Sequence, residues 1–216
     1  MADPGRLIRV LLVDDHAVVR AGYGTLLKDA PGIEIVAEAE GGNAALRAYV
    51  EHDPEIVIMD LSLPDLGGIE VIRRIVARNP AAKVLVFSMH EDTVFVEQAL
   101  AAGARGYITK NSAPQVLLDA VRHIARGESY LDEGIAQRLA WQRARGRNSP
   151  FAALSTREFE IFCLLAEGLN ASEISRRLSL SSKTVANYTT QIKAKLGAAT
   201  VAELARLAIR HGVVQA

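Results

Sequence analysis

The chain has 216 residues, of which 50% are hydrophobic and 23% are charged, and its 25 basic and 25 acidic side chains give a formal net charge of zero. This length accommodates two small domains with cores of their own, and the composition is that of an ordinary globular protein. Because no apolar stretch reaches the roughly 18 residues of a membrane span, we expect no membrane-spanning segment and no membrane partner.

The N-terminus and the single cysteine indicate a cytoplasmic protein. The first residues, "MADPGRLIRV", lack the pattern of a signal peptide and continue into a predicted strand. Cys163 has no second cysteine with which to form an internal disulfide, so a reducing compartment is expected. Its apolar neighbours in "FEIFCLLAEG" predict a core position for this side chain.

The zero net charge conceals a difference between the two ends of the chain. Residues 1–127 carry 13 basic and 17 acidic side chains, a balance of −4, whereas residues 147–216 carry 9 basic and 5 acidic side chains, a balance of +4. This asymmetry indicates two domains with different partners.

Short apolar runs recur along the first part of the chain, and helix-length segments separate them. The runs occupy residues 7–13, 33–39, 55–60, 83–89 and 106–110. Continuous apolar strands that alternate with helices indicate a parallel sheet covered on both faces. We therefore expect an α/β domain over residues 1–127, with a doubly wound five-stranded parallel sheet that binds ligands at the carboxyl ends of its strands.

Carboxylates follow two of these strands. Asp14 and Asp15 end the first strand and Asp60 ends the third, and these two strands are neighbours in a doubly wound sheet. Three carboxylates at one edge repel each other unless a cation lies among them. Hard oxygen ligands suit Mg²⁺, so the sequence predicts a Mg²⁺ (or Mn²⁺) site at this edge.

A hydroxyl and an ammonium group complete the same edge. Ser88 ends the fourth strand and Lys110 ends the fifth. A cation, a hydroxyl and an ammonium around a carboxylate can hold a phosphoryl group, with Asp60 as the nucleophile. A single aspartate at a strand end is usually only a turn residue, but four strand ends that carry such groups in order favour the reactive interpretation.

The motifs "VLLVDDH", "VIMDLSLPDLGGIE", "VLVFSMH" and "AGARGYITK" resemble the receiver domain of two-component response regulators, over roughly residues 7–127. The resemblance implies a flavodoxin-like fold in which Asp60 is the phosphoacceptor. It also implies that Asp15 binds Mg²⁺ directly, with Asp14 beside it, and that the backbone carbonyl of Ser62 is a further ligand.

The same resemblance assigns the switch residues. It implies that Ser88 is the hydroxyl that moves to the phosphoryl group, that Tyr107 is the aromatic switch and that Lys110 contacts the phosphoryl group. Asn111 departs from the pattern, because many receivers carry proline after the lysine. This departure leaves the geometry of that turn open.

The segment after the sheet domain is predicted to be a linker, residues 128–150, with a short helix around residues 135–141. After it, "STRE" and "NASE" each place a capping residue three positions before a glutamate. With glycines at the expected ends, the pattern predicts four helices near residues 156–167, 171–178, 182–195 and 200–211.

The stretch "ASEISRRLSLSSKTVANYTTQIKAKLG" predicts a helix-turn-helix, in which the second helix starts near Ser182. The face of that helix outside its apolar stripe carries Lys183, Asn187 and Thr190, with Ala186 and Gln191 at its margin. Short polar side chains with flanking lysines suit the major groove of DNA, although a solvated polar face is the simpler alternative.

The stretches "LSTREFEIFCLLAEGLNASEIS" and "LSLSSKTVANYTTQIKAKLG" are similar to the LuxR-type DNA-binding domain of NarL/FixJ-class response regulators, over about residues 152–213. Within that class, "TREFEI" and "LAIRHG" resemble regulators of the GacA/UvrY kind. The docking in this family implies base contacts from Ala186, Asn187 and Thr190. It implies phosphate contacts from the remaining predicted DNA-binding residues, which are Lys183, Thr184, Tyr188 and Gln191.

The last helix, "TVAELARLAIRHG", carries an apolar stripe. The family resemblance implies that this helix pairs two DNA-binding domains, so we expect a homodimer on DNA. The predicted dimer contacts are Val201, Leu204, Ala205 and Ala208.

Together these features predict a bacterial response regulator and not an enzyme: a sensor histidine kinase phosphorylates Asp60, and this controls dimerisation and binding to promoter DNA. One alternative is an aspartate-nucleophile phosphatase, but that class has a second Asp two residues after the nucleophile, where Ser62 stands. The other is a constitutive DNA-binding protein with a silent receiver, which the complete set of pocket residues disfavours.

Overall fold

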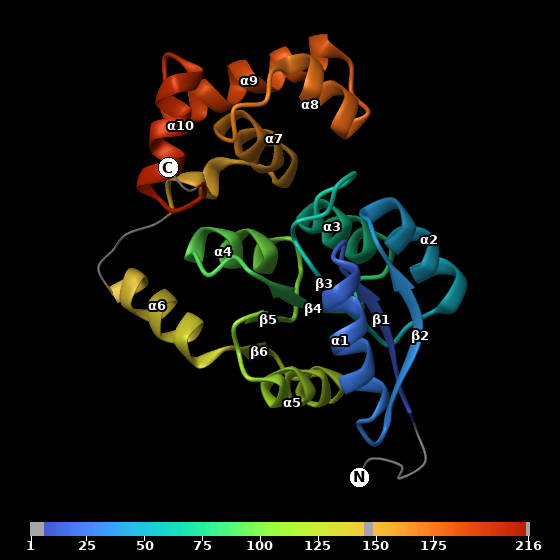
Figure 1. Cartoon of the computed structure of the whole chain (residues 1–216). Helices are drawn as coiled ribbons and strands as arrows, with labels where there is room; N and C mark the ends of the chain where they lie inside the picture. Colours follow the sequence, from blue (N-terminus) through green and yellow to red (C-terminus); the bar gives the residue numbers. More distant parts are fainter. Residues whose placement is uncertain (1–6, 145–148, 215–216) are drawn as a thin grey trace. The chain divides into compact units, whose positions relative to one another are not determined.

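Parallel strands in the order β2-β1-β3-β4-β5-β6 form one sheet, and a group of short helices follows it along the chain (Figure 1). This computed structural model describes residues 7–144 and 149–214. The chain divides into two compact units: one contains the residues up to Glu91 together with Ala99–Gln137, and the other contains Asp92–Gln98 together with the residues from Arg138 on.

The strands and helices have the following bounds. The strands are β1 Ile8–Val13, β2 Ile33–Ala39, β3 Ile56–Met59, β4 Lys83–Ser88, β5 Gly106–Thr109 and β6 Tyr130–Leu131. The helices up to residue 144 are α1 Ala17–Lys28, α2 Gly42–His52, α3 Gly68–Arg78, α4 Thr93–Ala101, α5 Pro114–Ala125 and α6 Glu133–Ala144. The helices from residue 149 on, which we call the second part of the chain, are the 3₁₀ helix η1 Pro150–Ala153, α7 Thr156–Ala166, α8 Ala171–Leu178, α9 Ser182–Leu196 and α10 Val201–Arg210.

The central strands are buried on both faces, as the continuous apolar runs predict. Successive side chains of a strand point to opposite faces. Val10 and Leu12 of β1 join a core with α1 and α5 on one face, whereas Leu11 and Val13 are equally buried on the other. The fold is therefore the expected doubly wound, flavodoxin-like sheet, whose carboxyl ends meet at one edge.

The sheet has one strand more than the sequence predicts. Tyr130 and Leu131 pair in parallel with Gly106 and Tyr107 of β5, and so form β6. A two-residue edge strand leaves no apolar run in the sequence, which explains why five strands were expected.

The segment predicted as a linker, residues 128–150, contains the whole of α6, which confirms the short helix expected around residues 135–141. Asp132 accepts a hydrogen bond from the backbone N–H of Gly134 at 3.0 Å, at the N-terminal end of this helix. The part of the predicted linker at residues 145–148 lies outside the described residues.

The second part has the four predicted helices, α7 to α10. Both capping boxes are present: Ser155 with Glu158 starts α7, and Asn170 with Glu173 starts α8. Cys163 is half-buried in α7, and burial raises the pKa of its thiol well above the ordinary value.

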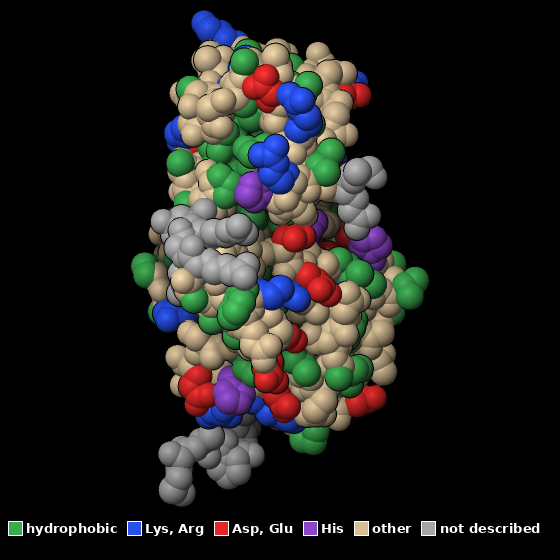
Figure 2. Space-filling view, turned by 90° about the vertical axis from the view of Figure 1, so that its left-hand side faces the viewer, with side chains coloured by type: hydrophobic (Ala, Val, Ile, Leu, Met, Phe, Trp, Pro, Cys, Tyr) green, Lys and Arg blue, Asp and Glu red, His purple; other side chains and the backbone are tan. Residues whose placement is uncertain are grey.

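The surface that Figure 2 shows mixes basic, acidic and isolated apolar side chains. Single exposed apolar residues of this kind are normal for a folded protein. Across residues 7–144 and 149–214, no helix combines the length and the apolar character needed to cross a membrane.

Candidate functional site

The carboxyl edge of the sheet brings Asp14, Asp60 and Lys110 together, as predicted. The Nζ atom of Lys110 lies 2.5 Å from Oδ2 of Asp14 and 2.7 Å from Oδ2 of Asp60. All three side chains are almost entirely buried. The ammonium group therefore links the ends of β1 and β3 to the end of β5.

Burial alone would lower the pKa of Lys110, but hydrogen bonds from Lys110 to Asp14 and Asp60, together with the charges of both carboxylates, outweigh it and raise that pKa. Lys110 is accordingly a permanent cation in this pocket. It neutralises one of the negative charges at the edge and leaves the cluster anionic.

The backbone that follows β3 fixes the Asp60 carboxylate. Its Oδ1 atom accepts hydrogen bonds from the N–H groups of Leu61, at 2.7 Å, and Ser62, at 3.3 Å. Gly68, the first residue of α3, lies so close to this loop that a Cβ atom would collide with the carbonyl oxygen of Asp60. The glycine thus lets α3 start directly against the backbone of the predicted phosphoacceptor.

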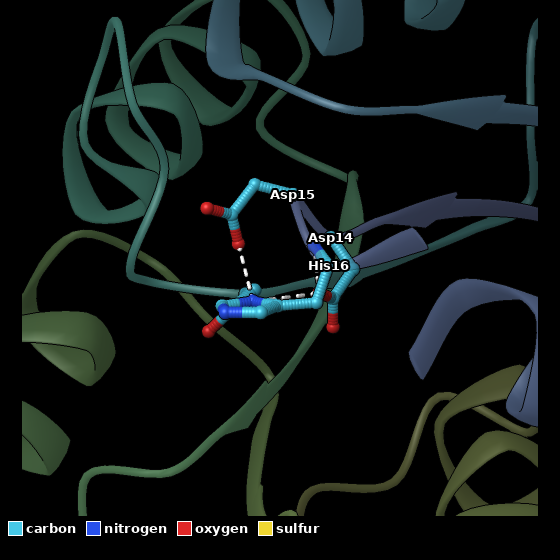
Figure 3. Close-up of side chains that lie close together, drawn as sticks. Asp14, Asp15 and His16 are labelled. Atoms are coloured by element: carbon cyan, nitrogen blue, oxygen red, sulfur yellow. Dashed lines mark hydrogen bonds and ion pairs between the residues drawn. The ribbon is translucent and has the colours of Figure 1, made fainter. Parts of the chain in front are cut away.

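Asp15 lies at the same edge beside His16, as Figure 3 shows. The ligand atoms of Asp14, Asp15, His16 and Asp60 all lie within 4.8 Å of one another. Oδ1 of Asp15 is buried and accepts no hydrogen bond from any described residue, although Nδ1 of His16 is 2.7 Å away. An unsatisfied carboxylate oxygen in an anionic cluster fits a divalent cation, and the oxygen donors suit Mg²⁺.

The backbone of His90 connects the two predicted switch residues. Its N–H donates to Oγ of Ser88 at 3.3 Å, and its carbonyl accepts a 2.7 Å hydrogen bond from the hydroxyl of Tyr107. Ser88 and Tyr107 are both fully buried. The turn after Lys110 forms without proline, because Ser112 N–H donates to the carbonyl of Thr109 at 3.1 Å.

The helix-turn-helix of the second part consists of α8, a tight turn and α9. Ser179 ends α8 in the left-handed conformation, with φ 52°, and Ser181 caps α9 by accepting from the N–H of Thr184. Arg157 of α7 donates to the carbonyl of Leu178 at 3.1 Å, which ties the turn to the domain core.

Val185 and Ile192 form the buried stripe of α9. The predicted DNA contacts lie outside this stripe. Lys183, Ala186, Asn187, Thr190 and Gln191 are exposed, whereas Thr184 and Tyr188 are half-buried. Their exposure is compatible with contact to a ligand.

The four predicted dimer contacts differ in their exposure. Leu204 and Ala208 are completely buried, because α10 packs against α7 through this side. Val201 is 40% exposed and Ala205 is half-buried. Ile209, which the sequence analysis did not select, is 45% exposed one turn after Ala205. An apolar stripe seen in sequence does not by itself distinguish the core side of a helix from its outer margin.

Two family models match the chain: "response regulator receiver domain" over residues 10–122, and "bacterial regulatory proteins, luxR family" over residues 152–208. The chain belongs to the response regulators. It is a transcription regulator that combines a receiver domain with a LuxR-type DNA-binding domain.

Relatives of this response regulator support the same conclusion. Response regulator UvrY of Escherichia coli K12 is 38% identical over 212 residues, which are 97% of each chain. Response regulator GacA of Pseudomonas aeruginosa is 38% identical over 212 residues, 97% of this chain and 99% of GacA. These matches confirm the resemblance to the GacA/UvrY kind.

A solved structure of RcsB from Salmonella enterica serovar Typhimurium also resembles this regulator. That RcsB, bound to promoter rprA in the presence of the phosphomimetic BeF₃⁻, is 25% identical, with a TM-score of 0.71 and coverage of 93% of this chain and 98% of RcsB. The likeness extends over both domains.

Three contributors to the pocket of this response regulator were not predicted from its sequence. The backbone of His90 and the N–H of Leu61 act through main-chain atoms, which a sequence pattern does not reveal. His16 could have been predicted, since it follows the two aspartates directly in "VLLVDDH".

Proposed function

We propose that this response regulator accepts a phosphoryl group on Asp60 from a sensor histidine kinase in the cytoplasm, and that the modification controls its binding to promoter DNA as a dimer. The observation that carries the proposal is the convergence of Asp14, Asp60 and Lys110 at one sheet edge, within 2.7 Å of the shared ammonium group. A lone turn aspartate would need neither the second carboxylate nor the buried lysine.

The transfer step follows from the pocket. A carboxylate oxygen of Asp60 attacks phosphorus, a new P–O bond forms, and the P–N bond to the kinase histidine breaks with its electron pair on nitrogen. Lys110 provides positive charge for the phosphoryl oxygens, and the N–H groups of Leu61 and Ser62 hold Asp60 in place.

Asp14, Asp15, Asp60 and the backbone carbonyl of Ser62 would hold Mg²⁺ or Mn²⁺. When bound, the cation neutralises charge on the phosphoryl oxygens and orients the group for in-line transfer. The anionic character of the cluster and the unsatisfied Oδ1 of Asp15 support this assignment.

Ser88 and Tyr107 would be the switch. Both are bonded to the backbone of His90, so a movement of the Ser88 hydroxyl toward a phosphoryl group on Asp60 removes one hydrogen bond from His90 and frees the segment that holds Tyr107. Phosphorylation changes the output only as far as the phosphoryl group favours one of the two arrangements.

The domain from residue 151 to residue 216 would bind DNA through α9, with the receiver at 1–127 and a linker at 128–150. Ala186, Asn187 and Thr190 would face bases, and Lys183, Thr184, Tyr188 and Gln191 would lie near phosphates. RcsB bound to promoter rprA is a relative that binds DNA, which supports DNA binding by this domain.

The dimer contact would use the outer side of α10. Val201, Ala205 and Ile209 follow one another at intervals of four residues, so they lie on one side of the helix, whereas Leu204 and Ala208 stay in the core. A symmetric pair of such domains would place two α9 helices on two half-sites.

The proposal also includes slow loss of the phosphoryl group without a partner enzyme. Ser62 and His90 share a 3.1 Å hydrogen bond between their side chains. This bonded pair belongs to the loops that follow Asp60 and Ser88, where it would influence the access of water to phosphorus.

Intact mass spectrometry tests the proposal. The full chain is incubated with Mg²⁺ and a small acyl phosphate, and it is compared with Asp60→Asn. A single phosphoryl adduct that is absent from the variant, together with tighter dimerisation or DNA binding of the same sample, is expected. No adduct on the wild type with any acyl phosphate would show that Asp60 does not accept a phosphoryl group.

A further inference from the structure

His16 is the one member of the acidic cluster for which the proposed phosphotransfer has no role. Its side chain is 65% exposed. It is the N-cap residue of α1, yet its side chain makes no capping hydrogen bond. Its backbone N–H donates to Oδ1 of Asp14 at 2.9 Å, which fixes the residue beside the carboxylates (Figure 3).

The imidazole is aimed at the unsatisfied carboxylate oxygen. Nδ1 of His16 lies 2.7 Å from Oδ1 of Asp15 and 3.6 Å from Oδ1 of Asp14. The same Oδ1 of Asp15 accepts no hydrogen bond from the described part of the chain. The two atoms form an ion pair when the imidazole is protonated, whereas the lone pair of an unprotonated Nδ1 lies close enough to Oδ1 for both atoms to bind one cation.

Lys110 does not compete for these atoms. Its ammonium group contacts Oδ2 of Asp14 and Oδ2 of Asp60, on the other oxygen of each carboxylate. The cluster is therefore divided into a lysine side and a side formed by Asp15 and His16.

We infer that His16 is a nitrogen ligand of the metal centre, so that this receiver binds transition-metal dications such as Mn²⁺ and Ni²⁺ through an imidazole that Mg²⁺ does not use. Imidazole is a good ligand for the later first-row metals, whereas Mg²⁺ prefers oxygen and retains its waters. The inference rests on the metal site of the proposed function and adds a fourth side chain to it.

The test compares the untagged full chain with His16→Gln, which keeps a polar side chain of similar length but loses the imidazole. His52→Gln is the matched control, because His52 ends α2 before the amino end of β3, at the opposite edge of the sheet from Asp60. Pulsed electron paramagnetic resonance of bound Mn²⁺ detects an imidazole nitrogen through its hyperfine coupling. Titration calorimetry at one fixed pH gives the affinities for Ni²⁺ and Mg²⁺.

We expect nitrogen coupling in the wild type and in His52→Gln, but not in His16→Gln. The affinity of His16→Gln for Ni²⁺ should fall by about tenfold to a hundredfold, the range known for loss of a supporting group at metal sites, while its Mg²⁺ affinity changes by less than about twofold. The retained Mg²⁺ binding shows that the variant is folded.

Nitrogen coupling that persists in His16→Gln would overturn the inference. So would equal losses of Ni²⁺ and Mg²⁺ affinity, because His16 would then only position the carboxylates. Phosphorylation by an acyl phosphate with Mg²⁺ is measured on the same samples. A wild type that binds Mn²⁺ through nitrogen but forms no adduct would contradict the proposed function alone, and an adduct without nitrogen coupling would contradict the inference alone.

Discussion

Asp14 and Asp60 each lie against the ammonium group of Lys110, whereas Asp15 lies against the imidazole of His16. These pairings give the aspartates of the cluster different physical environments. The two buried ones are neutralised in part by a permanent cation, while Asp15 adds negative charge to an edge that is already anionic. At the residue scale, the pocket is arranged for an incoming cation at some expense of stability.

Asp15→Asn should therefore stabilise the metal-free protein. Removing one of several like charges a few ångströms apart is expected to raise the free energy of unfolding by about 1 kcal/mol where water screens the charges, and by up to about 4 kcal/mol at an effective dielectric constant of about 20. Urea unfolding in a chelator measures this change. The same titration with Mg²⁺ should show that the wild type gains stability and the variant gains much less.

Glu34→Gln is the control for that comparison, because Glu34 is an exposed carboxylate on the edge strand β2. Its neutralisation should change the unfolding free energy by less than about 0.5 kcal/mol. A lower free energy of unfolding for Asp15→Asn in the chelator would show that the Asp15 carboxylate does not destabilise the metal-free protein.

Gly68→Ala should destabilise the receiver, because its Cβ atom would collide with the carbonyl oxygen of Asp60 and with the backbone of Leu61. Crowding of this kind costs about 1–3 kcal/mol. Gly22→Ala is the matched control in the interior of α1, where a Cβ atom meets nothing within 4 Å. That substitution should stabilise by about 0.5–1 kcal/mol, since alanine is the better helix residue.

Chemical unfolding of the two variants distinguishes a packing effect at Gly68 from a general effect of replacing glycine. The free energy of unfolding is expected to fall for Gly68→Ala and to rise for Gly22→Ala. Equal effects of Gly68→Ala and Gly22→Ala would show that the contact between α3 and the Asp60 loop is not tight.

Single side chains of the pocket could be predicted from sequence, because their positions at strand ends are set by the parallel sheet. Asp14, Asp60 and Lys110 meet as expected. The link through the His90 backbone could not be predicted, because it depends on where two main-chain groups point after β4 has ended.

At the scale of the element, local signals in the sequence defined the helices well. The capping boxes at Ser155 and Asn170 place the starts of α7 and α8, since each satisfies N–H groups that have no partner within the helix. The strand β6 was not predicted, and the sequence did not separate the core side of α10 from its outer side. Both depend on contacts with distant segments, which no local pattern contains.

Glu158 joins the capping box of α7 to an ion pair with α9, and this pair should make the stability of the domain depend on pH. Burial alone would raise the pKa of Glu158, but hydrogen bonds from Lys195 and Ser155 and the charge of Lys195 lower it overall. A carboxylate with a lowered pKa stabilises the folded state above its unfolded pKa, near 4.5, and this contribution is lost as the pH falls through the folded pKa.

Glu158→Gln should thus cost about 1–2 kcal/mol at neutral pH, and the difference from the wild type should shrink below pH 4.5. Hydrogen exchange of amides in α7 and α9 measures the stability of this domain separately from the receiver. Glu173→Gln removes the corresponding contact of the α8 capping box, at 2.7 Å to the N–H of Asn170. It should cost less, because no lysine pairs with Glu173 in the described part of the chain. A difference that stays constant down to pH 3 would contradict the linkage.

At the scale of the whole molecule, the predicted phosphoacceptor and the predicted recognition helix belong to different domains. Phosphorylation can therefore change DNA affinity only by favouring one of two arrangements of the chain. Two factors then determine the affinity for DNA. Phosphorylation of Asp60 raises the affinity by one factor through the switch, and each contact of α9 with a DNA phosphate raises it by another. The two factors should multiply independently.

Lys183→Gln and Asp60→Asn separate these factors. On duplex DNA selected from a random pool, Lys183→Gln should weaken the phosphorylated and unphosphorylated forms by the same factor. It should also reduce the slope of log affinity against log salt by about 0.9, because one fewer phosphate is neutralised. Asp60→Asn should keep the DNA affinity of the unphosphorylated form and lose the increase in affinity on phosphorylation.

Lys28→Gln, which changes an exposed lysine of α1 in the receiver, is the control. It should leave both the DNA affinity and its increase on phosphorylation unchanged. If Lys183→Gln altered the tightening factor itself, Lys183 would belong to the coupling between the domains, and the recognition helix would take part in the switch as well as in the contact with DNA.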